Sequence, residues 1–449
     1  MQDALPPPSV AVHANISRPP VLPGDSKRSS SKSSKWLSAL YVAISLLVGG
    51  TIGHAETKDE VTSYDLEGVI ALAIERNPLV LDAGGVLTQH EGERLKAKAY
   101  PNPSVTGQTG SGSIRDPSTD FSKTEYAFTL SQKLEWLGTR IARRDAAEAA
   151  LAGASIGQEE VRLNVRAEAM VAFYELLLAQ QVVEIARQNR NTVGEVARAV
   201  KARVESGEGA RFESIKASVE VMKADQEVTR AENDIQVKRA ALNALTAGAL
   251  GQRFAITGIF RAPIKGLVLD DLQIRALSRH PTILRIQKGV ERADHTITKE
   301  KQSRIPDVTL FGSYAREVGR EGVVGGLGIP TPLWYRREGE ITAALGTKRR
   351  EEADLIRAQS ELAKVITQHL QDAETSSRQI EVFEQGLLKQ AQEALRVAQL
   401  SFRFGSAGLL EVLDAQRVAR QIQIEYAQAQ RDLSLALSRL ERAVGERLL

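Results

Sequence analysis

The sequence contains no cysteine, and this absence excludes several kinds of chemistry. Without a thiol the chain has no disulfide, no thiolate metal site, no cysteine nucleophile and no lipid-modified cysteine. The histidines beyond residue 55 are His90, His280, His295 and His369, and none has the His-Glu-x-x-His spacing of a helical zinc site. We therefore expect these histidines to be solvated or to cap helices, with no metal, no cofactor and no catalytic residue.

Net charge and long apolar runs are confined to the first residues. Basic residues between Ser26 and Lys35 precede an apolar run, Trp36–Ile52, and small residues follow at 53–55. This order predicts a leader and signal peptide at 1–55. A retained membrane anchor is the alternative, because the run is near the lower length of a spanning helix.

The remainder of the chain is electrically neutral. The leader holds five basic and two acidic residues, which leaves 54 residues of each sign. A neutral chain gives no electrostatic reason to bind nucleic acid. No later stretch has the apolar length that a membrane helix needs, so a membrane location would require a β-barrel.

An internal repeat organises the chain after the leader. Similar segments recur in the same order: 66–78 and 269–281, 103–106 and 306–309, 206–207 and 404–405, and 213–217 and 411–415. Two widely separated pairs share one offset, which is typical of a tandem duplication. The sequence predicts two repeats, 56–265 and 266–449.

Each repeat is expected to contain the same elements. A helical segment of about 30 residues ends near Ala99 or Ser303, where prolines follow. The expected strands are about 103–115 and 122–134, then about 306–316 and 322–331. The expected helical hairpins are about 139–248 and 338–446.

The strands show period-two alternation. Apolar Tyr126, Phe128, Leu130 and Leu134 alternate with polar Thr129, Ser131 and Lys133, and Val323, Leu327 and Ile329 alternate with Val324, Gly326 and Gly328. Such strands fit a lipid face and a lumen face, although a soluble sandwich strand fits equally well. Four strands cannot close a barrel, whereas three copies would supply twelve. Gly322–Gly328 lacks the Lys-Ser/Thr ending of a phosphate loop.

The helical hairpins carry a coiled-coil seam. From 165 to 204, steps of four and three residues land on Val, Ala or Leu, interrupted only by Arg190. A helix from Arg140 to Glu205 would be roughly 100 Å long. It would reverse at 206–209 and return over 210–247, and the second repeat would match this with 338–403 and 409–445.

The whole chain after the leader resembles the TolC-like outer-membrane factor family. The resemblance is carried by Asn77-Pro78, by the strand exit Leu130–Leu134 and most specifically by the tip Phe402–Gln416. It implies a homotrimer with a twelve-stranded barrel in outer-membrane lipid and an α-helical tunnel through the periplasm. A periplasmic adaptor (membrane fusion) protein and an inner-membrane RND pump would dock at its lower end. The fold expected is therefore mainly α with a β-barrel part.

The segment Glu135–Arg144 is similar to the heavy-metal branch of that family, the Czc/Cus type, although Thr139 stands where that branch often has lysine. The resemblance thus favours metal-cation efflux. Drug or solvent efflux and type I secretion remain alternatives. An alternative of another class is a membrane-anchored periplasmic coiled-coil adaptor or scaffold. The chain offers no support for an enzyme.

The candidate site lies at the tip of the second hairpin. Glu411 and Asp414 are three residues apart and would share a helix face. In a trimer they would form a ring of six carboxylates, which can select cations, and the resemblance implies a periplasmic gate there. Their alternative role is to complement the helix dipole. Gly405, Gly408, Gly207 and Glu213 are expected to support the tips.

Overall fold

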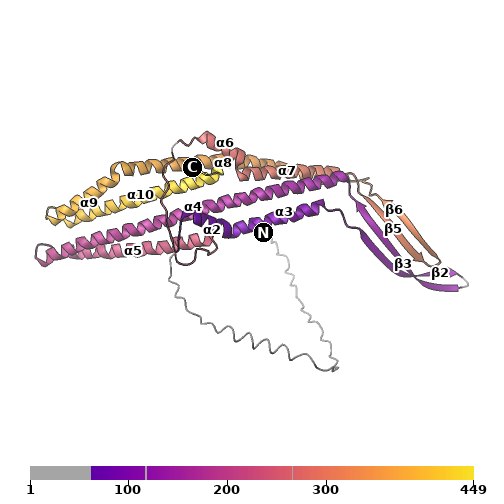
Figure 1. The fold of residues 1–449 in the computed structure, drawn as a ribbon, viewed down its shortest axis with the longest axis horizontal. Coiled ribbons are helices and arrows are strands. Elements are labelled where there is room, and N and C mark those ends of the chain that lie inside the picture. Colours follow the sequence, from indigo (N-terminus) through magenta and orange to yellow (C-terminus); the bar gives the residue numbers. More distant parts are fainter. Residues whose placement is uncertain (1–61, 117–118, 265, 449) are drawn as a thin grey trace, which may run out of the picture. The chain divides into compact units, whose positions relative to one another are not determined.

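This computed structural model describes residues 62–116, 119–264 and 266–448. Most of them are helical (Figure 1). The expected leader, 1–55, lies outside the described residues. The remainder forms one compact unit, Val61–Leu449, so the predicted repeats 56–265 and 266–449 do not separate into two units. Elements nevertheless follow in the same order in both halves: two helices, two strands and a helical hairpin.

Each expected 30-residue helix is broken in two by a proline. The first half has α2 (Leu66–Arg76) and α3 (Pro78–Lys98), and the second has α6 (Leu269–Arg279) and α7 (Pro281–Gln302). The break occurs because a residue before proline is disfavoured in the helical region. Asn77 and His280 accordingly have extended backbones, with ψ of 128° and 130°.

The first helical hairpin joins α4 (Leu137–Glu205) to α5 (Arg211–Leu245). The predicted seam is confirmed, since eight of its twelve positions are buried: 165, 169, 176, 179, 183, 186, 193 and 200. Arg190 is exposed and its Nε lies 2.9 Å from Asp225 Oδ1 of α5. Helix α4 also contacts α3, α7 and α10 and is therefore central to the packing.

The second helical hairpin differs from the prediction of one continuous helix over 338–403. It consists of α8 (Glu338–Val382), a π turn η1 (Phe383–Leu387) and α9 (Leu388–Arg403), which return through α10 (Leu409–Val444). Gly386 leaves the helical region with φ 163° and ψ −21°. Glycine has low helix propensity, and the insertion of a wider turn interrupts the regular ladder at this residue.

The strands form one antiparallel sheet in the order β2-β3-β5-β6. Their bounds are β2 Ser104–Asp116, β3 Thr119–Leu134, β5 Val308–Glu317 and β6 Arg320–Gly328. The second strand begins three residues before the expected position, and the fourth ends three residues early because Pro330 follows. Pairing of β3 with β5 joins the two halves.

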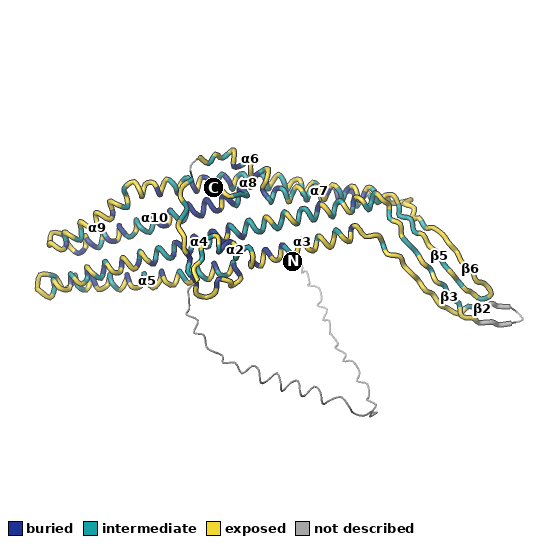
Figure 2. Tube along the Cα trace, in the orientation of Figure 1, coloured by how far each residue is buried: buried dark blue, intermediate teal, exposed yellow. Residues whose placement is uncertain are grey.

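The register gives this sheet one apolar and one polar face. Phe128 stands opposite Tyr314, which stands opposite Val323, so aromatic and aliphatic side chains share a face across three strands. Thr129 stands opposite Ser313 on the other face, and their hydroxyls are hydrogen-bonded at 3.0 Å. The apolar face is open, with Phe128 55% and Val323 79% exposed. The described residues of these four strands are all exposed or intermediate in burial (Figure 2). A soluble sandwich strand would instead be covered.

The helical part of the unit contains the largest apolar core of the described residues, at the base of the first hairpin. It surrounds the fully buried Phe173 and Leu176 of α4 and Leu242 of α5. A short parallel pair, β1 (Thr62–Tyr64) with β4 (Phe254–Ile256), closes this core. The arrangement holds the base of the first hairpin firmly while its tip extends away from the core.

Candidate functional site

The two hairpin tips turn in the same way. Each long helix ends with a glycine in the left-handed region, Gly207 at φ 83° and Gly405 at φ 75°. The amide of Glu208 donates to Arg203 O at 2.9 Å, and the amide of Ser406 donates to Ser401 O at 2.8 Å. These bonds across five residues define a Schellman motif, which glycine favours because it has no Cβ.

Gly408 has a different role from Gly405. Its φ of −84° and ψ of 164° are extended, and it occupies the N-cap of α10. It therefore directs the chain into the return helix without requiring a left-handed backbone. Glu213 lies in the first turn of the matching return helix α5 and is half-buried.

Glu411 and Asp414 lie on the first turns of α10, and both are exposed. Asp414 Oδ1 lies 2.5 Å from Arg417 Nη2, one turn further along the same helix. Glu411 has no ion-pair partner within the described part of the chain. A single chain thus presents two neighbouring carboxylates, one of them partly neutralised.

The tips pack together through an apolar cluster that includes Val200 of α4, Ala217 of α5, Phe402 of α9 and Val412 of α10. All four are buried. The acidic residues are therefore placed on a helix whose opposite face is held by the first hairpin.

A polar network next to this apolar cluster joins α4, α5 and α10, and it was not predicted from the sequence. Gln416 Nε2 donates to Asn189 Oδ1 at 2.7 Å, and Asn189 Nδ2 donates to Glu227 Oε2 at 3.3 Å. Arg420 forms an ion pair with the same Glu227. Residues 409, 412, 416 and 419 follow steps of three and four along α10 and are all buried. The glutamine at position 416 of this buried seam was the sequence signal that could have indicated the network. Polar residues at such positions specify helix register.

The network borders a groove of about 390 Å³ between α5 and α10. Its lining includes Lys216, Glu220 and Lys223 of α5 and Asp414, Arg417 and Arg420 of α10. Charged groups thus line the groove between the two hairpins, and the buried side chains of Asn189 and Gln416 lie beside it. The network therefore joins α4 and α5 of the first hairpin to α10 of the second.

A second set of ion pairs holds the base of the hairpins. Glu175 of α4 lies 2.8 Å from Arg431 of α10 and 3.1 Å from Lys238 of α5. Burial alone would raise the pKa of Glu175, but hydrogen bonds from Arg431 and Lys238 hold that pKa below its usual value. This carboxylate joins three helices as an anion.

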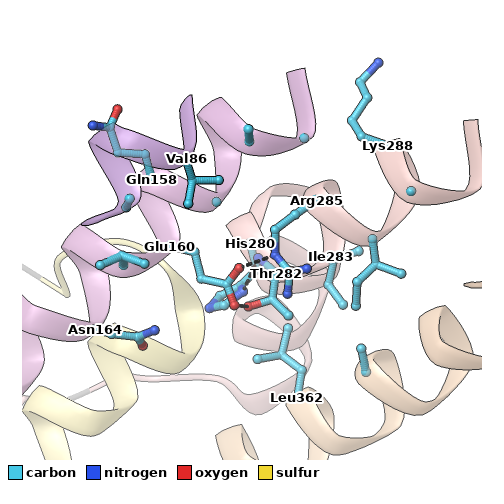
Figure 3. Close-up of a pocket in the computed structure, with 18 of the residues that line it drawn as sticks. Val86, Gln158, Glu160, Asn164, His280, Thr282, Ile283, Arg285, Lys288 and Leu362 are labelled. Atoms are coloured by element: carbon cyan, nitrogen blue, oxygen red, sulfur yellow. Dashed lines mark hydrogen bonds and ion pairs between the residues drawn. The ribbon is translucent and has the colours of Figure 1, made fainter. Parts of the chain in front are cut away.

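A larger groove of about 1040 Å³ lies among α3, α4, α7 and α8 (Figure 3). Glu160 accepts hydrogen bonds from Thr282 Oγ1 at 2.7 Å and Arg285 Nε at 2.6 Å. His280 Nδ1 accepts from the Thr282 amide at 3.2 Å, while Nε2 lies 3.0 Å from Arg442 O. The capping role predicted for histidine is confirmed at His280. In the described residues no group of three or more His, Asp or Glu could hold a metal.

Comparison with known proteins identifies the family. Residues 69–248 and 273–446 match the family described as outer membrane efflux protein. The chain belongs to the outer membrane efflux protein family. This efflux protein is therefore located in the outer membrane and spans the periplasm as a component of an efflux channel. Membership excludes the alternative of a membrane-anchored adaptor or scaffold.

Individual relatives of this efflux protein are similar over nearly their whole length. CzcC of Cupriavidus metallidurans, a cobalt-zinc-cadmium resistance protein, is 25% identical over 382 residues, which cover 85% of this chain and 90% of CzcC. The outer membrane efflux protein BepC of Brucella suis is 24% identical over 421 residues, 90% of each chain. A crystal structure of CusC superposes with a TM-score of 0.74 at 16% identity, covering 86% of this chain and 93% of CusC. The predicted TolC-like fold is confirmed.

One expectation about this efflux protein was wrong. We predicted no run apolar enough for a membrane helix after the leader, but α4 contains one by length and composition. Half of that window is buried inside the protein. The stretch includes core residues such as Phe173 and Leu176, so its apolar character is explained by packing within the unit.

Proposed function

We propose that this efflux protein works as a homotrimer, with twelve strands closed into one barrel. The observation that carries the proposal is the four-stranded sheet β2-β3-β5-β6, whose apolar face is open and whose outer strands β2 and β6 have no partner on one side within the described chain. Unpaired strand edges cannot face lipid, because their backbone groups would lack hydrogen bonds. Two further copies would satisfy both edges. We further propose that the two halves, 56–265 and 266–449, arose by duplication.

The tips are the proposed docking site for a periplasmic adaptor and, through it, an inner-membrane RND pump. Phe212 of α5, Phe404 of the second turn and Leu410 of α10 are 71%, 85% and 65% exposed. Large apolar side chains that remain open at such turns are typical of interaction surfaces. The protein itself would be a passive duct without catalysis, because the pump supplies the driving force.

The proposed cargo is a heavy-metal cation. The name of CzcC describes cobalt, zinc and cadmium resistance, and the alignment covers 90% of CzcC. In a trimer, Glu411 and Asp414 would place six carboxylates around one axis, a ring suited to cations. Drug or solvent efflux and type I secretion are the alternatives, since other efflux proteins such as BepC are similar over as much of the chain.

The gate and the cargo can be tested together. Replacing Glu411→Ala and Asp414→Ala should raise the Zn²⁺ concentration for half-block of the channel in planar bilayers by about tenfold, a change of about 1.4 kcal/mol. The physical reason is the loss of the acidic ring.

In cells that have the matching adaptor and pump but lack their own duct, the wild-type chain should restore tolerance to Co²⁺, Zn²⁺ or Cd²⁺.

The matched control is Glu291→Ala with Asp294→Ala, an exposed acidic pair at the same spacing on α7. This pair lies away from the tips, so Zn²⁺ block should be unchanged. If the tip variant and the control behave alike, the gate role is wrong. Restored drug tolerance without metal tolerance would assign the duct to the drug-efflux alternative.

A further inference from the structure

Both tryptophans of the described residues lie in segments that connect a strand to the following helix. Trp136 stands between β3 and α4, and Trp334 stands between β6 and α8. The only other tryptophan, Trp36, belongs to the expected leader. Tryptophan is enriched at membrane–water interfaces because its ring is amphipathic. The two positions are therefore at the level where the sheet leaves the lipid.

The two rings have different surroundings. The Trp136 indole Nε1 donates to Gln302 Oε1 at 3.0 Å, and its amide donates to Asp307 Oδ1 at 2.8 Å. These bonds tie the exit of β3 to the entry of β5. Trp334, by contrast, is 94% exposed and has no hydrogen-bond or ring partner in the described part of the protein. Trp136 is thus explained by the fold, whereas Trp334 is not.

The neighbours of Trp334 extend the apolar surface. Leu333 is 69% and Tyr335 is 55% exposed, and the Tyr335 hydroxyl lies 2.6 Å from Glu340 Oε2. This hydrogen bond fixes the polar end of Tyr335 on α8. The segment follows directly from β6, where Leu327 and Val323 belong to the open apolar face of the sheet. Leu333–Tyr335 therefore continues a surface that lies in the membrane.

Basic residues are concentrated in the segments that connect the sheet to the helices. The four segments that enter and leave the sheet, 94–100, 133–144, 299–307 and 332–340, contain twelve Lys and Arg against five Asp and Glu. The side chains of Lys96, Lys301 and Arg336 among them are exposed and form no ion pair in the described ranges, although the Arg336 backbone amide donates to Glu338 Oε2 at 3.0 Å. Since the chain after the leader is neutral as a whole, this excess is local. Basic side chains next to a membrane favour anionic lipid headgroups.

We propose that Leu333–Arg336 is a lipid anchor. Trp334 inserts at the boundary between headgroups and acyl chains of the periplasmic leaflet, and Arg336 with Lys301 binds anionic phospholipid headgroups. The anchor sets how deeply the sheet sits in the bilayer. It depends on the outer-membrane location and not on the proposed cargo or gate.

Depth-dependent fluorescence quenching tests the position of Trp334. Two variants on a Trp36→Phe background retain one tryptophan each: Trp136→Phe leaves Trp334, and Trp334→Phe leaves Trp136. Both are placed in phosphatidylethanolamine–phosphatidylglycerol vesicles with bromine near the headgroup end or near the end of the acyl chains. Trp334 should be quenched several-fold more than Trp136, and more strongly by the shallow bromines.

A second measurement tests the headgroup contact. Trp334 emission should shift further to the blue in vesicles containing phosphatidylglycerol than in phosphatidylcholine alone, and Arg336→Gln with Lys301→Gln should remove this difference. Arg357→Gln with Arg378→Gln, two exposed arginines of α8 away from the sheet, is the control and should retain it. Equal quenching of Trp334 and Trp136 would overturn the anchor. So would Trp334 emission that bromine at either depth leaves unchanged, which would assign the ring to a contact between copies.

Discussion

At the scale of single residues, Asn77 and His280 perform one task in the two halves. The side chain of each accepts a hydrogen bond from the amide two residues later, which caps α3 or α7. Each also reaches the end of a return helix, Asn77 through Nδ2 to Leu245 O and His280 through Nε2 to Arg442 O. The second contact joins the first helices of a half to its hairpin. Only the histidine can change its charge near neutral pH.

The contacts of His280 require the neutral ring, because Nδ1 accepts one hydrogen bond while Nε2 donates the other. Burial lowers the pKa of His280, although the Arg442 carbonyl and Glu160 oppose that shift. The unfolded chain, with a histidine pKa near 6.5, therefore binds the proton more readily. Between the folded and unfolded pKa values, stability falls as the pH falls.

We predict that His280→Asn, which copies the first half, keeps the cap and reduces the loss of thermal stability between pH 7 and pH 5. His280→Ala should cost about 1 kcal/mol at pH 7, because the cap is lost. Circular dichroism melting of the detergent-solubilised protein at a series of pH values measures both. A pH dependence that is the same in His280→Asn and wild type would contradict the assignment.

At the scale of elements, the tips show how backbone geometry separates two glycines of one turn. Gly405 is left-handed, whereas Gly408 is extended at an N-cap. We predict that Gly405→Ser destabilises the protein by about 1–2 kcal/mol, because an L side chain is strained in the left-handed region.

Gly408→Ser is the matched control for the tip turn. Serine is a favoured N-cap, and open space surrounds the position that its Cβ would occupy. This variant should be neutral or slightly more stable in thermal unfolding, and hydrogen exchange should show faster opening at the tip only for Gly405→Ser. Equal losses in the two variants would show that the turn does not have the geometry described.

At the scale of the whole molecule, the sheet is incomplete in one chain. Its order leaves β2 and β6 as edges, and a cysteine-free sequence allows these edges to be cross-linked without background. We predict that Ser104→Cys with Gly328→Cys, at the helix-side ends of β2 and β6, gives covalent dimers and trimers on oxidation in outer membranes. A second variant with Gly326→Cys in place of Gly328→Cys tests a pairing between β2 of one copy and β6 of the next that is shifted by two residues.

The control for this experiment is Thr129→Cys with Ser313→Cys, which face each other on β3 and β5 of one chain. That pair should form a bond only within the chain, detected as a faster-migrating monomer under non-reducing conditions. Monomers alone from both edge variants, while the control reacts, would count against closure of the barrel by further copies.

Features that depend on local periodicity and short motifs could be predicted before the fold was known. The alternation around Phe128 predicted the two faces of the sheet, and the steps of four and three predicted the buried seam of α4. The repeat predicted which segments correspond, and the tip motif carried the family resemblance. These features could be read because each side chain's direction follows from its own helix or strand period.

Features that depend on contacts between distant segments could not be predicted in this way. The bond between Gln416 and Asn189 joins residues 227 positions apart, and that between Asn77 and Leu245 joins residues 168 apart. Local periodicity contains no information about such partners. The same is true of the β3–β5 pairing, of the π turn at Gly386, and of the contrast between a tethered Trp136 and an open Trp334. Each depends on which surfaces meet, and that is decided when the two halves pack.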